Sequence, residues 1–100
     1  MGQTVVMVAG VDPLTGVGGD ASYVRAHARA ARRACFTPHV FCVSPRGAVV
    51  EAEFGTVHRV PTPSRLVRAV MAFVTGPAAP RLIHAFGIHG HVGVEAARRL

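Results

Sequence analysis

Closely spaced glycines give this chain its clearest capacity for chemistry. Gly16, Gly18 and Gly19 stand in the segment GVGGDA at residues 16–21. Glycine permits tight turns and lets a ligand approach main-chain N–H groups. A helical pattern opens at Asp20, and the free N–H groups and positive dipole end of a helix N-terminus attract anions. We therefore predict a phosphate-binding turn formed by Gly16, Gly18, Gly19 and Asp20.

Two known phosphate motifs can be compared with this turn. A Walker A loop needs a lysine to reach the terminal phosphates, and the chain has no lysine, so that motif is excluded. The dinucleotide fingerprint G-x-G-x-x-G/A is matched by residues 16–21, but residues 10–15 separate it from the preceding apolar run. Ser44 and Arg46 follow the second apolar run and suit a 2′-phosphate. An NADP- or nucleotide-binding module thus stays open as an alternative, as does a turn without a ligand.

Three histidines fall late in the chain with the spacing H-x4-H-x-H. His84, His89 and His91 could ligate zinc in principle, but no cysteine or carboxylate stands nearby to complete a tetrahedral set, so we predict no metal. We assign them instead as candidates for contact with an acceptor substrate. The remaining histidines are expected at the surface or at sheet edges: His27, His39 and His58.

Apolar runs alternate with helical patterns along the chain. Residues 4–9 form a continuous apolar run, which is typical of a strand buried on both faces of a parallel sheet. Further strands are expected at residues 40–43, 56–60 and 81–86, with a partial strand within 48–55. Helices are expected at residues 20–35, from a cap at Ser64 to about residue 75, and from about residue 90.

This alternation predicts an α/β fold, a Rossmann-like doubly wound parallel sheet with right-handed crossovers. If the expected strands are numbered 1 to 4 along the chain, leaving out the partial strand, their order in such a sheet is 3-2-1-4. The strands at residues 4–9 and 81–86 are then neighbours. The turn at residues 10–19 would then face the turn at residues 86–91 across a crevice at the carboxyl edge. We expect the functional site there.

The net charge and the amino-acid composition limit the classes of binding partner that we expect. The net charge is +6, yet the arginines are dispersed and no aromatic ladder accompanies them, so we expect no nucleic-acid partner. Peripheral contact with the anionic inner face of a membrane stays open.

Cys35 and Cys42 are expected to be small core residues in a reduced compartment. A signal peptide and a long apolar segment are both absent from the sequence, so we expect a cytoplasmic protein.

The 100 residues are expected to form one domain. Residues 93–100 read as a helix without a stop signal, so we expect the chain to be the N-terminal part of a longer protein.

Four segments together resemble the N-terminal domain of GT-B glycosyltransferases of the family 4 type, which transfer sugar from a nucleotide sugar with retention. They are GVGGDASYV at 16–24, PHVFCV at 38–43, HRVP at 58–61 and LIHA at 82–85. The sequence departs from the family pattern at Pro38, Arg81 and Phe86.

The resemblance implies that the chain is the acceptor-side half of a GT-B fold. Gly18 and Gly19, with Gly16 as a flexible partner, would approach the diphosphate of a UDP- or GDP-sugar with backbone N–H groups, without a metal or other cofactor. The acceptor would be a small molecule, a glycan or a lipid. A C-terminal donor-binding domain would be a required partner, so this chain alone would be catalytically incomplete, with no catalytic residue assigned.

Overall fold

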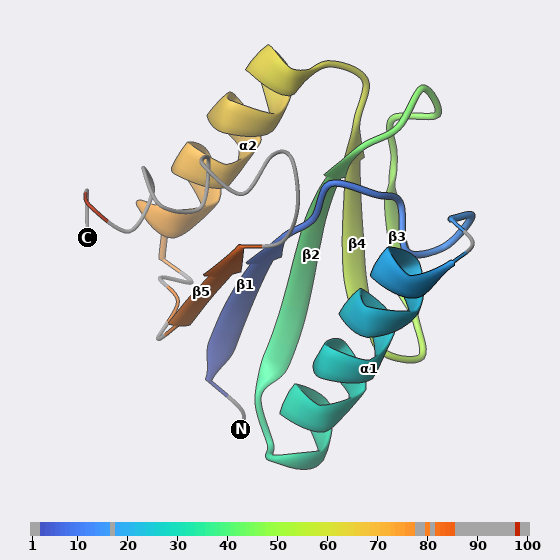
Figure 1. Ribbon diagram of the computed structural model, residues 1–100. Coiled ribbons are helices and arrows are strands. Elements are labelled where there is room, and N and C mark those ends of the chain that lie inside the picture. Colours follow the sequence, from blue (N-terminus) through green and yellow to red (C-terminus); the bar gives the residue numbers. More distant parts are fainter. Residues whose placement is uncertain (1–2, 17, 78–79, 81, 86–97, 99–100) are drawn as a thin grey trace.

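Parallel strands organise the molecule, and Figure 1 shows them in a computed structural model. The structure describes residues 3–16, 18–77, 80, 82–85 and 98. The strands β1 (Thr4–Val8), β2 (Thr37–Val43), β3 (Val49–Ala52), β4 (Gly55–Val60) and β5 (Leu82–Ala85) form one sheet in the order β3-β4-β2-β1-β5. β4, β2, β1 and β5 run parallel, whereas β3 pairs antiparallel with β4.

The apolar strand β1 lies inside the sheet and is buried on both faces. Val5 and Met7 belong to one core cluster, and Val6 and Val8 belong to the other. Successive side chains of a strand point to opposite faces, so a strand covered on both sides needs an uninterrupted apolar run. This confirms the prediction made from residues 4–9.

Two helices cover the two faces of this sheet (Figure 1). α1 (Gly19–Arg33) buries Ala21, Val24 and Ala28, and Val24 and Ala28 belong to the cluster that holds Met7. α2 (Pro63–Val74) buries Leu66, Val70 and Val74 in the opposite cluster, with Val6 and Phe41. Each buried set recurs at helical spacing, which is the amphipathic pattern expected of a helix packed on a sheet.

The predicted α/β, Rossmann-like class and the predicted order of the parallel strands are confirmed. The strand expected at residues 56–60 is β4 and the one expected at 81–86 is β5, so β4-β2-β1-β5 is the order 3-2-1-4. The partial strand is β3, whose antiparallel pairing with β4 makes the sheet mixed. The helix expected from residue 90 lies outside the described residues except for Arg98. The parallel strands bring three segments to their shared carboxyl edge, namely residues 9–16 with Gly18, residues 44–48 and the start of α2.

Two local expectations were wrong. Thr62, and not Ser64, is the N-cap of α2, because its side chain accepts a hydrogen bond from the N–H of Arg65 and Pro63 occupies the first turn. Cys35 is exposed and not a core residue. It follows α1 with a φ of 67°, the left-handed conformation.

The end of α1 explains the placement of Cys35. The N–H of Phe36 donates to the carbonyl of Ala31, and the N–H of Cys35 donates to that of Arg32, both at 3.0 Å. This pair of bonds is a Schellman motif, in which the left-handed position is usually glycine. A cysteine there carries the steric cost of its Cβ.

We predict that Cys35→Gly stabilises the fold by about 0.5 to 1 kcal/mol, because glycine adopts the left-handed conformation without that cost. Urea unfolding followed by circular dichroism would measure the change. Cys35→Ala is the matched control and should give no gain, since alanine keeps the Cβ. Equal stabilisation by both variants would show that loss of the exposed thiol, and not backbone strain, is responsible.

Candidate functional site

The turn between β1 and α1, which we call the glycine loop (residues 10–19), is folded around Asp12. The main-chain carbonyl of Asp12 accepts a hydrogen bond from the N–H of Gly16 at 2.7 Å. Its side-chain Oδ1 accepts another from the N–H of Leu14 at 2.9 Å. A short acidic side chain that bonds the backbone two residues ahead stabilises a tight turn. Asp12 therefore sets the local path of the loop.

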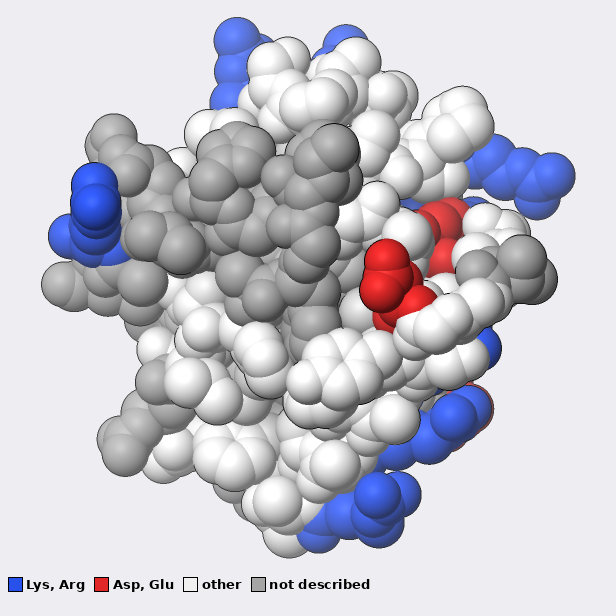
Figure 2. Space-filling view, in the orientation of Figure 1, with Lys and Arg blue, Asp and Glu red and all other residues white. Residues whose placement is uncertain are grey.

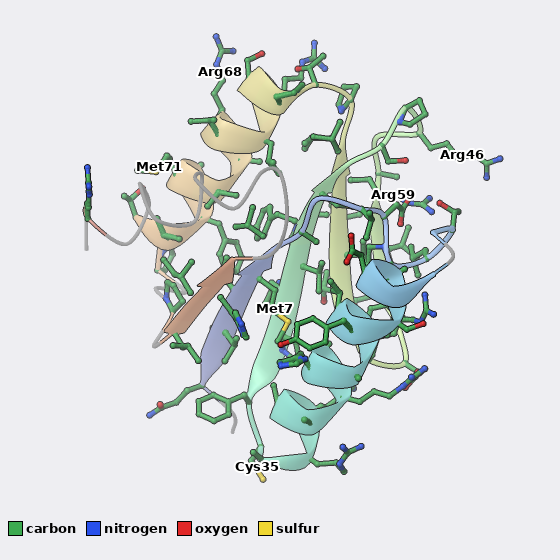
Figure 3. All side chains as sticks on the ribbon, viewed as in Figure 1. Met7, Cys35, Arg46, Arg59, Arg68 and Met71 are labelled. Carbon is green, nitrogen blue, oxygen red and sulfur yellow. The ribbon has the colours of Figure 1, made fainter. Side chains whose placement is uncertain are left out.

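Asp12 is also tied to the sheet by charge. Its Oδ2 lies 2.9 Å from Nε of Arg59 on β4, and each side chain is only 9% exposed. Figure 3 shows Arg59 at the carboxyl end of the sheet beside a carboxylate. Neither atom makes a hydrogen bond of normal geometry, so the attraction is an ion pair. Two charges buried this deeply stay charged at tolerable cost only while they remain paired.

Arg25 holds the loop from the side of α1. Its Nη1 donates to the carbonyl of Pro13 at 2.9 Å, and its Nη2 donates to Oγ of Ser22 at 3.1 Å. Gly16 is required for packing, because a Cβ there would lie 2.6 Å from the Asp12 carbonyl oxygen. The middle of the loop is thus fixed by contacts to both α1 and β4.

The end of the loop, by contrast, is open. Gly18 is the N-cap of α1 with a φ of 97°, a conformation that favours glycine, and no side chain caps the helix. A Cβ added at Gly18 or at Gly19 would meet nothing within 4 Å. Within the described residues, the start of α1 is therefore open around these two Cβ positions. The unpaired N–H groups of such a helix N-terminus favour an anion.

Acidic side chains also stand near this opening. Asp20 lies in the first turn of α1 and is exposed. Figure 2 shows acidic atoms gathered over the region where α1 begins, with arginines around the periphery of the same face. Arg59 compensates the charge of Asp12, whereas Asp20 presents its carboxylate to solvent.

The predicted acceptor-side histidines are only partly described. His84 lies on β5 in register with Met7, and its ring is 5.2 Å from that of His27 on α1. Burial first, and His27 second, lower the pKa of His84 below its usual value. His84 thus contributes to a ring cluster between α1 and β5, and its acceptor role stays a prediction. His89, His91 and the turn at residues 86–91 lie outside the described residues.

His39 and His58 were expected at the surface or at edges, and this was wrong. They lie half-buried on the adjacent strands β2 and β4, with Nδ1 of His39 2.9 Å from Nε2 of His58. The His58 ring stacks on Phe41 at 4.2 Å. Burial, followed by the neighbouring His39, lowers the pKa of His58 to about 4, and burial also lowers that of His39. The pair is neutral at pH 7 and packs as part of the α2 side of the sheet.

Cys42 is buried in the core, as predicted. This burial raises the pKa of its thiol to about 12. Within the described part of the chain, no group of three or more His, Cys, Asp or Glu side chains is placed to hold a metal ion. None of the helices described there is long and apolar enough to span a membrane.

The comparisons with known proteins give no relative: no family model, no curated protein and no solved structure matches this chain.

Three residues that hold the site were not predicted from the sequence, namely Asp12, Arg25 and Arg59. A signal was present for two of them. Asp12 is an acidic residue followed by proline between an apolar strand and a glycine run, and Arg59 is a charged residue in a segment predicted to form a strand of the sheet. Pairing opposite charges across the carboxyl edge would have indicated their contact.

We predict that Asp12→Asn destabilises the fold by about 3 kcal/mol, because it leaves Arg59 buried without its counter-charge. Asparagine keeps the oxygen that accepts from Leu14, so the local turn bond is retained. The double variant Asp12→Asn with Arg59→Met should recover part of the loss, since no unpaired charge remains. Urea unfolding would measure both.

The matched control is Arg29→Gln, which breaks the exposed ion pair of Arg29 with Glu53. Exposed pairs contribute little, so its effect should be much smaller. A loss for Asp12→Asn no larger than that for Arg29→Gln would contradict the role assigned to the buried pair.

Proposed function

We propose that the chain is the N-terminal, acceptor-side part of a retaining glycosyltransferase that uses a nucleotide-diphosphate sugar. The observation that carries this proposal is the open N-terminus of α1 at the end of a fixed glycine loop. A diphosphate is an anion of suitable charge for such N–H groups. The sequence resemblance to the family 4 type of GT-B enzymes supports the same assignment of Gly18 and Gly19.

Glycosyl transfer develops negative charge on the departing diphosphate. N–H donors that are already oriented stabilise this charge without reorganising during the reaction. In the proposed function, the first N–H groups of α1 are these donors. Asp12 and Arg25 contribute indirectly, because their contacts hold the residues that lead into Gly18.

Asp20 takes a different role from the glycines. A carboxylate repels a diphosphate but accepts hydrogen bonds from hydroxyl groups. Its exposed position in the first turn of α1 suits contact with a hydroxyl of the donor sugar or of the acceptor. The proposal therefore assigns phosphate contact to the backbone and sugar contact to the Asp20 side chain.

An NADP-binding module is the second candidate, favoured by the position of Arg46. This residue follows β2, the neighbour of β1, at the edge where the glycine loop lies. An arginine there suits the 2′-phosphate of NADP. Against it, residues 10–15 separate β1 from the glycines, which in the dinucleotide fingerprint follow the strand closely.

We predict that Gly19→Ala lowers the affinity for a nucleotide-diphosphate sugar by about tenfold or more. The added methyl group meets no protein atom, so folding should be unaffected, but it occupies the space through which a diphosphate approaches. Calorimetric titration of UDP-glucose and GDP-mannose into the protein, together with any donor-binding domain that its natural gene encodes, would measure this.

Thr15→Ala, an exposed position in the same loop, is the control and should leave binding unchanged. Equal affinity of Gly19→Ala and the unaltered protein for every nucleotide sugar tested would contradict the proposal. Saturable NADP binding that is lost in Arg46→Ala, without nucleotide-sugar binding, would favour the second candidate instead.

A further inference from the structure

A hollow lies at the carboxyl edge of the sheet, on the side of β4 and β3. It has a volume of about 540 Å³, within the usual range of small-molecule sites. We call it the arginine groove. Its lining contains no acidic residue and consists of Pro45, Arg46, Gly47, Ala48, Val49, Arg59, Val60, Pro61 and Arg65.

Two of the lining arginines lack partners. Arg46 and Arg65 are exposed, and within the described residues neither side chain makes a hydrogen bond or an ion pair. The arginines of α1 differ in this respect: Arg25 bonds the glycine loop, and Arg29 and Arg32 bond Glu53. Arg59 completes the lining, with its Nε directed to Asp12. The groove therefore gathers positive charge that the described protein does not neutralise.

The position of Arg65 strengthens this conclusion. It lies in the first turn of α2, which contains no acidic residue. A cation at the positive end of a helix dipole is unfavourable, and stabilising charges there are normally negative. An anion in the groove would interact favourably with Arg46, with Arg65 and with the helix end at once.

We propose that the arginine groove binds the phosphate group of a small phosphorylated molecule. Guanidinium groups match phosphate oxygens with two parallel hydrogen bonds, which favours phosphate over a halide or other spherical anion. Nucleic acid is disfavoured, because the remaining arginines are dispersed and partly engaged. This inference rests on the groove and not on glycosyl transfer.

The arginine groove and the glycine loop differ in the groups that would bind an anion. In the loop the donors are main-chain N–H groups at the start of α1, whereas in the groove they are side chains from the segment after β2 and from α2. Rigid proline residues, Pro45 and Pro61, form parts of its wall. Its ligand should therefore depend on arginine and be insensitive to Gly19.

Amide NMR titration of the chain with inorganic phosphate would test this proposal, with sodium chloride at equal ionic strength as the salt control. We expect saturable shifts at residues 46–48 and 64–65. Arg46→Gln and Arg65→Gln should each weaken the binding about tenfold, because each removes a charged hydrogen-bond donor. Arg68→Gln is the matched control, since Arg68 is exposed on the same helix and does not line the groove. Figure 3 shows Arg68 on the side of α2 away from Arg46 and Arg59.

Several outcomes would overturn the proposal. They are the absence of saturable shifts in the groove, equal weakening by Arg68→Gln, and equal shifts with sodium chloride alone. Shifts confined to residues 18–21 would also overturn it while leaving the glycosyltransferase proposal standing. Groove binding that persists in Gly19→Ala, in a protein that binds no nucleotide sugar, would support the groove and contradict the proposed function.

Discussion

The buried ion pair of Asp12 and Arg59 is the constraint on which the candidate site depends. Asp12 bonds the backbone of its own turn, and Arg59 projects from a strand inside the sheet. The ion pair therefore fixes the position of the glycine loop relative to β4. Because an unpaired charge at this depth would be costly, the loop cannot move far from the sheet without destabilising the fold. A loop fixed in this way presents the start of α1 in one orientation.

At the carboxyl edge of the sheet, the fixed part of the glycine loop lies near residues that are open to solvent. Gly16 is packed against the Asp12 carbonyl, whereas Gly18 and Gly19 face free space. On the other side of β4 the arginine groove is open to solvent and gathers charge. The proposed glycosyltransferase function uses the open helix end, and the proposed phosphate site uses the side chains of the groove. Both proposed sites lie at the carboxyl ends of the parallel strands, where the ligand-binding loops of such sheets meet.

Much of the fold could be predicted from local patterns. The apolar run at residues 4–9 predicted a strand buried on both faces, and the helical pattern at residues 20–35 predicted α1. These features depend on neighbours in the sequence, so periodicity reveals them. Cys35 was misplaced because its position is decided by the hydrogen bonds that end α1, and a residue other than glycine stands in the left-handed position.

Local sequence patterns could not predict the contacts that shape the site. Asp12 and Arg59 are far apart in the sequence, and they meet because β1 pairs with β2 and β2 pairs with β4. The same holds for His39 and His58, whose expected exposure ignored the covering by Phe73 of α2. The glycine positions were predicted from spacing, but their division into a packed Gly16 and open Gly18 and Gly19 required the structure.

A crystal structure of the protein with a bound nucleotide-diphosphate sugar would test the central claim most directly. We expect the diphosphate to accept hydrogen bonds from the N–H groups at the start of α1, at residues 19–21. We also expect the Asp12–Arg59 pair to be unchanged, because the loop is already in its binding conformation. A diphosphate bound elsewhere, with the start of α1 left in solvent, would contradict the claim that the glycine loop forms the donor site.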